Sequence, residues 1–136
     1  YITGLQLQVG DIATPFEHRD YEDEIRRCER YYQNSFSYGN IPGTSTDYAD
    51  AVITTSWTDS NIPFANPFKV EMRVAPTVTL RPRGSTTTGR VNHGGSDVVA
   101  SAQQIGTKNI AYIANTGGSS AGQFNAYTYE LFADLD

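Results

Sequence analysis

The sequence has few of the residues on which metal sites, disulfide frameworks and membrane spans depend. Its 136 residues include one cysteine, Cys28, which excludes an internal disulfide and a metal site built from several thiolates. The two histidines, His18 and His93, have no second histidine, cysteine or carboxylate at a metal-ligand spacing. No run of about 18 apolar residues occurs, so the sequence predicts no membrane-spanning helix.

Basic residues are outnumbered by acidic ones. Ten Lys and Arg stand against fifteen Asp and Glu, which gives a net charge of −5 and a pI near 4.9. This charge has the wrong sign for a protein that neutralises the phosphates of nucleic acid. No glycine-rich phosphate loop of the Walker or dinucleotide type occurs either. We therefore expect no nucleic-acid partner, no membrane partner and no cofactor.

Small and polar turn-forming residues are abundant instead. Gly, Ser, Thr and Asn together make up 45 of the 136 residues, beside 9 Tyr and 6 Phe. Gly and Asn supply unusual backbone angles at turns, whereas Thr and the aromatic residues pack well on pleated surfaces. The length is that of a single domain. The composition therefore favours one domain made mostly of strands joined by turns.

One segment has the charge and the periodicity of a helix. Residues 17–30 hold 10 of the chain's 25 charged groups. Four apolar or aromatic residues follow one another here at spacings of 4, 3 and 4, which places them on one face of a helix. We call these residues the helix stripe: Tyr21, Ile25, Cys28 and Tyr32. With Asp20 as the N-cap and acids in the first turn, the pattern predicts a helix over residues 20–33.

The rest of the chain has the patterns of strands and turns. Strands are predicted at residues 2–9, 51–57, 68–74, 77–80, 98–105, 109–114 and 124–135. The strict alternation in residues 68–74 makes this the clearest strand, and turn-rich sequence fills residues 83–95 and 115–122. Six or seven short strands after one helix predict a mainly β fold, namely an antiparallel jelly-roll-like β-sandwich.

These patterns divide the chain into three parts. Residues 1–17 are expected to be the end of an upstream domain or a linker strand, since we interpret a chain that begins with Tyr1 as a piece of a longer polypeptide. Residues 18–34 are expected to form a connecting helix, and residues 35–136 the C-terminal β-sandwich domain.

The last predicted strand indicates an oligomer. Apolar side chains point to both sides of residues 124–135, which in so small a domain indicates that one side packs against another subunit. Tyrosine suits such an interface, because its ring is buried while its hydroxyl keeps a hydrogen bond. The residues assigned to this interface are Tyr21, Ile25, Cys28, Tyr32, Tyr127, Tyr129 and Leu131.

Candidate catalytic residues are few. His93 falls in a polar Gly-rich stretch that favours a turn, His18 stands just before the helix, and packing within the helix explains Cys28 better than reactivity does. Glu130 and Asp134 share one face of a strand, but at the usual strand rise they stand about 13 Å apart, too far for the acid pair of a glycosidase. The sequence therefore predicts no catalytic residue, no metal site and no enzymatic activity.

Sugar binding is harder to exclude. Tyr48 and Trp57 lie among many Thr, Asn and Asp side chains, and sugar sites combine an exposed aromatic face with polar groups around it. Together with His93, they are the candidate glycan-binding residues. The alternative interpretation is structural, in that Trp57 ends a core strand and Tyr48 covers a loop.

Three stretches near the start of the chain have a residue order that is more distinctive than the hydrophobic pattern of a strand or helix requires. They are residues 2–10 (ITGLQLQVG), 13–19 (ATPFEHR) and 28–32 (CERYY). Together they resemble a junction found in tail-fibre and related virion proteins of tailed bacteriophages, with Gln8 where Glu is usual. Residues 68–79 and 127–135 also resemble this family, so the similarity extends over nearly the whole chain and is strongest in its first third.

The resemblance implies a structural module of a virion, on a tail fibre or on the capsid surface. Such fibres are generally homotrimers that contact other virion proteins, and the family assigns no catalytic residues to these motifs. Together with the Thr-, Gly- and Asn-rich loops on a β scaffold, the resemblance leads to our first hypothesis, attachment to a glycan on the bacterial surface. The alternative is a capsid-attached head fibre or decoration protein with a purely structural role. A polysaccharide depolymerase is the least favoured interpretation, because such enzymes need paired acids and longer repetitive folds.

Overall fold

The computed structural model describes residues 7, 9–12, 14–15, 19–42, 50–56, 60–117 and 122–134. This part of the chain is mainly β, with 41% of residues in strands and one short helix. The elements are α1 (Tyr21–Glu29), β1 (Tyr32–Asn34), β2 (Val52–Thr55), β3 (Asn61–Pro63), β4 (Thr77–Pro82), β5 (Arg90–His93), β6 (Ser96–Ile105), β7 (Ile110–Asn115) and β8 (Phe124–Phe132).

The helix begins where the sequence predicts it and ends early. Asp20 is the N-cap, and its carboxylate accepts a hydrogen bond of 2.8 Å from the backbone N–H of Glu22. The predicted end at residue 33 is wrong, because Tyr32 already belongs to β1 and pairs with Phe132 of β8. A long neighbouring strand with free backbone groups outweighs the helical spacing of the stripe at this point.

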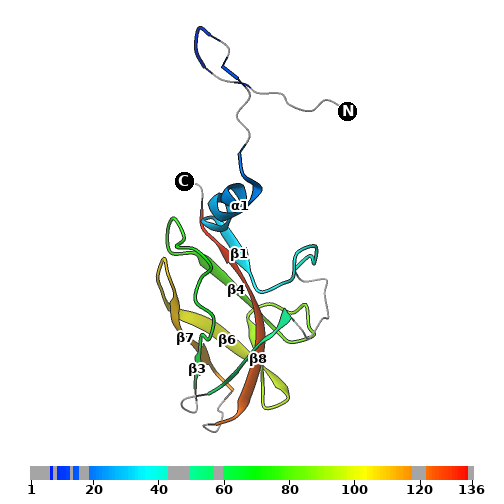
Figure 1. Ribbon diagram of the computed structural model, residues 1–136. Coiled ribbons are helices and arrows are strands. Elements are labelled where there is room, and N and C mark those ends of the chain that lie inside the picture. The colour runs from blue at the N-terminus through cyan, green and yellow to red at the C-terminus, as the bar shows by residue number, and fades with distance from the viewer. Residues whose placement is uncertain are drawn as a thin grey trace.

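The central strand is β8, which runs the length of the β domain (Figure 1) and pairs with four other strands. All its partners are antiparallel: β1 and β2 pair along one side of it, and β4 and β5 along the other. Successive side chains of a strand point to opposite faces. In β8 the odd-numbered residues Tyr127, Tyr129 and Leu131 point into the core, while Phe124 and Phe132 stay exposed on the other face.

The sheet continues from β5 through β6 and β7 to β3 and curls, so that its inner face encloses the hydrophobic core. The core draws on every strand of this sheet except β1, and on the connection before β4. Its most deeply buried side chains are Ile62, Met72, Val91, Ile110, Ile113, Tyr127 and Leu131. The mainly β, antiparallel character predicted from the sequence is therefore confirmed.

Most of the predicted strands are present with shifted ends. Strands occur within or across the predicted residues 51–57, 77–80, 98–105, 109–114 and 124–135. The predicted strand 2–9 lies almost wholly outside the described residues, as does most of residues 1–17. Of that segment, Leu7 and Val9 are described and are fully exposed.

The strand predicted most firmly, residues 68–74, is wrong. These residues form no strand, and their backbone N–H groups bond to scattered partners instead of one ladder. Phe68 and Met72 donate to the carbonyls of Lys108 and Thr107, at 3.4 and 2.8 Å. Their side chains are buried, whereas Val74 is exposed. Val70 is half-buried between them, so burial alternates over residues 68–73 although no strand forms.

A short strand was hidden in the turn-rich residues 83–95. Arg90–His93 form β5, which joins β6 through Gly94 and Gly95. These two glycines have φ angles of 54° and 91°, as a two-residue type I′ hairpin turn requires. The polar sequence that indicated a loop is therefore a hairpin.

Three of the residues assigned to an interface between subunits lie in the core of one chain. Tyr127, Tyr129 and Leu131 are buried by Phe64 and the other core side chains of the same chain. Both faces of the strand looked apolar in the sequence because one face builds the chain's own core. Their surface is not available to a second subunit, and their assignment is corrected.

Candidate functional site

Two surface hollows flank α1, and the segment from Lys69 to Arg73 lines both of them. The first lies between α1, β1 and the loop that follows β1; we call it the tyrosine groove. The second lies between α1, residues 70–73 and the β6–β7 turn; we call it the arginine hollow. Their positions depend on how α1 is held against the β domain.

Gln33 in β1 fixes this arrangement. Its buried side-chain amide donates hydrogen bonds to the carbonyl oxygens of Glu29 and Val70, at 2.9 and 2.8 Å. Its Oε1 accepts a bond of 2.8 Å from the backbone N–H of Lys69. One side chain therefore ties the end of α1 and the irregular segment to β1. Since buried polar groups left unpaired are costly, these three bonds hold both hollows in shape.

The tyrosine groove has a volume of about 400 Å³. Its aromatic and apolar lining consists of Tyr21, Ile25, Cys28, Tyr32, Phe36 and Tyr38. The rings of Tyr21 and Tyr38 are 76% and 81% exposed, so both offer open faces. Polar side chains at its rim are Glu24, Glu29, Asn34, Asn40 and Lys69.

The third ring, that of Tyr32, is held by hydrogen bonds of its hydroxyl. This hydroxyl donates to Oε2 of Glu130 at 3.1 Å and accepts from Nδ2 of Asn34 at 3.2 Å. Partial burial raises the pKa of the Tyr32 hydroxyl, and the nearby Glu130 carboxylate acts in the same direction, whereas the Asn34 hydrogen bond opposes them. The hydroxyl therefore stays protonated and remains a hydrogen-bond donor.

Asp50 holds the loop that carries Tyr38. Its buried carboxylate accepts hydrogen bonds from the N–H and the hydroxyl of Ser37, at 3.0 and 2.7 Å, and from Nδ2 of Asn40 at 2.8 Å. These bonds, the Ser37 hydroxyl first, lower the pKa of Asp50 below its ordinary value, against the effect of burial. The charged carboxylate thus clamps both sides of Tyr38.

The groove combines open aromatic faces with fixed amide and carboxylate groups. Aromatic faces can cover the apolar C–H face of a sugar ring, and amides and carboxylates can bond its hydroxyl groups. Lys69 adds a positive charge, since its Nζ lies 5.5 Å from the centre of the Tyr38 ring and 3.5 Å from Oε1 of Glu29. The arrangement is suited to hold a polar, ring-shaped ligand.

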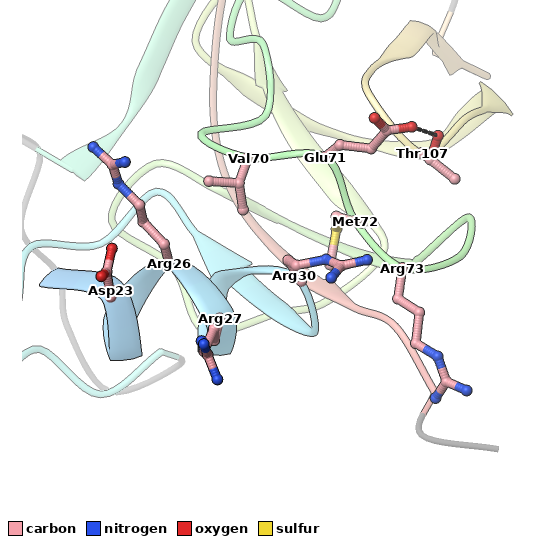
Figure 2. A pocket seen from close by; sticks show the side chains of 9 residues that line it. All are labelled: Asp23, Arg26, Arg27, Arg30, Val70, Glu71, Met72, Arg73 and Thr107. Carbon is pink, nitrogen blue, oxygen red and sulfur yellow. Dashed lines mark hydrogen bonds between the residues drawn. The ribbon is translucent and has the colours of Figure 1, made fainter. Parts of the chain in front are cut away.

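The arginine hollow has a volume of about 570 Å³ and lies on another side of α1 (Figure 2). Arg26, Arg27 and Arg30 come from α1 and its C-cap, and Arg73 comes from the irregular segment. The backbone N–H of Arg73 donates to the carbonyl of Arg30 at 2.9 Å, which joins the two walls. Half of the chain's eight arginines line this one hollow.

A third hollow, of about 720 Å³, lies at the end of β8 that is distant from α1. We call it the far-end hollow. Ile53 and Phe124 are exposed there, and Phe124 is 71% exposed. Arg83, Asn92 and Gln123 supply its polar side chains. It contains one aromatic ring, against four in the tyrosine groove.

Of the three residues predicted to bind a glycan, the structure describes His93. His93 is only 6% exposed, and its Nδ1 is hydrogen-bonded to Oδ1 of Asn125, its partner on the neighbouring strand β8. It cannot contact a surface sugar, so that prediction is wrong; the error arose because its stretch was taken for an open turn. Tyr48 and Trp57, together with His18, lie outside the described residues.

The helix stripe, by contrast, is brought together at the tyrosine groove. Tyr21, Ile25, Cys28 and Tyr32 all line it. Cys28 is exposed in the single chain, because α1 is too short and too peripheral to bury that face. Its packing against another subunit stays a prediction. The stripe therefore forms one wall of a surface groove within a single chain.

Sequence reasoning missed Tyr38, Lys69 and the arginine hollow. Tyr38 stands in a Ser-Tyr-Gly turn, a position that presents a side chain to solvent and could have been noticed. Arg26, Arg27 and Arg30 are exposed on α1 and its C-cap, and helical spacing alone gives no sign that Arg73 lies near them. Their approach to Arg73 depends on a segment that the sequence assigned to a strand.

Comparisons of the chain with protein-family models, with curated proteins and with solved structures find no match. Within the described ranges, no helix is long and apolar enough to cross a membrane. Over the same residues, no group of three or more His, Cys, Asp or Glu side chains is placed to hold a metal ion.

Proposed function

We propose that this chain is a non-enzymatic module of a tailed-phage fibre, which attaches the virion to a glycan of the bacterial surface through the tyrosine groove. The proposal includes a homotrimer on the virion and a jelly-roll-like sandwich as the finer description of the curled sheet. Two things support it: the resemblance of residues 2–32 to fibre junctions and the chemistry of the groove.

The observation that carries the proposal is that the rings of Tyr21 and Tyr38 are open while their surroundings are fixed. Asp50 and Gln33 place the groove's two walls through buried hydrogen bonds. A site that is already ordered before binding loses little conformational entropy when the ligand arrives. Weak contacts to a sugar are then sufficient, and several copies in one fibre multiply them.

The test is a glycan array followed by calorimetric titration of the bound oligosaccharides. Tyr38→Ala is expected to weaken binding by about tenfold or more, because it removes an exposed ring from the groove. Phe124→Ala is the matched control, since it removes an equally exposed ring from the far-end hollow. Binding that survives Tyr38→Ala and is lost in Phe124→Ala would move the site to the far end and overturn the proposal for the groove.

A second candidate function is purely architectural, as a head fibre or decoration protein. The observation that favours it is the exposure of Leu7, Val9 and Ile12, at 98%, 107% and 79%, just before the exposed helix stripe. Large apolar side chains that one chain leaves in water favour burial against another. In this function a second copy occupies the groove and no glycan binds.

Light scattering of wild type and Ile25→Asp separates the two functions. If the stripe is buried between subunits, the introduced charge is expected to dissociate the oligomer, because a buried unpaired charge costs several kcal/mol. If the groove is open, Ile25→Asp leaves the mass unchanged. The first result, together with silence on the array, would contradict glycan attachment through this groove.

A further inference from the structure

The arginine hollow has a charge that neither the core nor the helix requires. The chain carries a net charge of −5, yet four arginines and only two acids, Asp23 and Glu71, line this hollow. Glu71 is engaged already, by the hydroxyl of Thr107 at 3.1 Å and by Nζ of Lys108 at 3.6 Å. The local charge is therefore positive on an acidic protein.

Ion pairs within the described part of the chain do not account for the guanidinium groups of α1 and its C-cap. Among the described residues, Arg26, Arg27 and Arg30 form no ion pair. Arg26 and Arg27 stand in the last turn, where they complement the negative end of the helix dipole. Arg73 differs from them in that it comes from residues 68–74, and its backbone N–H donates a hydrogen bond to the carbonyl of Arg30.

The walls of the hollow are fixed, as those of a binding site should be. Figure 2 shows α1 on one side and the segment that carries Val70, Met72 and Arg73 on the other. The Arg73 guanidinium lies over the Tyr31 ring, 5.9 Å from its centre, and Gln33 holds the segment at Val70. Planar guanidinium groups bind carboxylate and phosphate oxygens through paired hydrogen bonds.

The hollow and the tyrosine groove lie on two sides of one helix. A helix with its side chains is about 10 Å across, a distance that a few linked sugars can span. We propose that the arginine hollow binds the carboxylate or phosphate group of an acidic polysaccharide whose neighbouring sugars occupy the tyrosine groove. This inference rests on the proposed function and adds the ligand class: the bacterial glycan is anionic.

The experiment compares three polymers by calorimetric titration against the whole chain. The probes are polygalacturonate, its carboxyl-reduced neutral counterpart and a poly(glycerol phosphate) teichoic acid. Wild type is expected to bind at least one acidic polymer about tenfold or more tightly than the neutral polymer, with an affinity that falls as salt rises. Which acidic polymer binds distinguishes carboxylate from phosphate.

The double variant Arg26→Gln/Arg30→Gln tests whether the arginines of the hollow bind the acidic groups. It is expected to lose the preference for acidic polymers, whereas Arg83→Gln/Arg90→Gln, with the same change of net charge, keeps it. Arg83 lines the far-end hollow and Arg90 belongs to β5, so neither lies at α1. Equal losses in both double variants, or no loss in the first, would overturn the inference.

Polymer binding by Tyr38→Ala distinguishes a failure of this inference from a failure of the proposed function. If neutral and acidic polymers bind equally and both depend on Tyr38, the groove binds glycans and the arginine inference fails. If acidic binding depends on Arg26 and Arg30 but not on Tyr38, the hollow binds anions and the groove proposal fails. Absence of binding to all three polymers overturns the anionic-glycan inference, while the array remains the test of the groove.

Discussion

The strands around β8 and the region around α1 are held together by different forces. The inward-facing residues of β8 are buried in a continuous apolar core, and four strands bond to its backbone. In α1 no residue is buried. Its position depends on a few directed hydrogen bonds from Gln33 and from the backbone of Arg73 and Ala133.

This difference indicates which part of the molecule can change in sequence without loss of the fold. The burial of apolar surface contributes a large free energy that does not depend on direction. Each polar contact contributes little and requires a specific geometry. The groove and the arginine hollow therefore lie on the part of the fold that can be altered without unfolding the core. Recognition sites are commonly found on such peripheral segments of a rigid scaffold.

The largest loss in the free energy of unfolding is expected when a core side chain is shortened. Leu131→Ala should lower the free energy of unfolding by about 3 kcal/mol, because it leaves a cavity among fully buried side chains. Ile25→Ala on α1 should lower it by less than about 1 kcal/mol. Urea unfolding of both variants measures the two values. Similar losses would mean that α1 is as much a part of the core as β8.

The next effect should come from the polar link between the two regions. Gln33→Met keeps the size of the side chain but leaves the Lys69 N–H and the Glu29 and Val70 carbonyls without their partner. We expect a loss of about 1 to 3 kcal/mol, with faster amide hydrogen exchange in α1 and unchanged exchange in β8.

A surface glutamine provides the control for this experiment. Gln103 donates one exposed hydrogen bond of 2.8 Å to the Ser101 hydroxyl, so Gln103→Met should change stability by less than about 0.5 kcal/mol. Uniformly faster exchange across the whole chain in Gln33→Met would show that α1 and the core unfold as one unit.

A smaller effect with a defined pH dependence is expected at Asp50. Its pKa in the folded chain lies below the ordinary value of 3.8, so the unfolded chain takes up the proton first as the pH falls. The stabilisation is therefore complete above pH 3.8, begins to fall near that value and is lost as the pH passes through the folded pKa. Asp50→Asn removes this dependence.

The measurement is the difference in unfolding free energy between wild type and Asp50→Asn from pH 6 to pH 2. This difference should be constant at the upper end and shrink below pH 3.8. Asn40→Ala, which removes one donor to the carboxylate, should show a partial effect in the same direction. A difference that grows on acidification has the wrong sign and would contradict the clamp around Tyr38.

The same contrast explains which predictions from the sequence succeeded. Strands that build the core, such as β8 and β4, were recognised because they are short runs rich in aromatic or β-branched residues. The helix start was recognised from Asp20, since capping is a local interaction. These features need no knowledge of distant residues.

The failures concern segments whose structure is decided by distant partners. Residues 68–74 alternate like a strand, but their N–H groups bond to Gln33, Arg30 and the β6–β7 turn. The helix ends early because β8 takes Tyr32 as a strand partner. The tyrosine groove and the arginine hollow depend on both of these contacts, so no local pattern could have placed their walls.

The smallest effect on stability is expected for a substitution of Cys28. The reactivity of its thiol, however, gives the sharpest test of whether another subunit covers α1. The thiol is exposed in one chain, so Cys28→Ser should change the free energy of unfolding by less than about 0.5 kcal/mol. In a monomer the thiol should react with Ellman's reagent at the rate of a small-molecule thiol. If sister subunits bury the helix stripe, the reaction should be slow at high protein concentration and accelerate on dilution, because dissociation uncovers Cys28. A fast reaction at every concentration would remove the stripe from the oligomer interface and leave the groove open to a ligand.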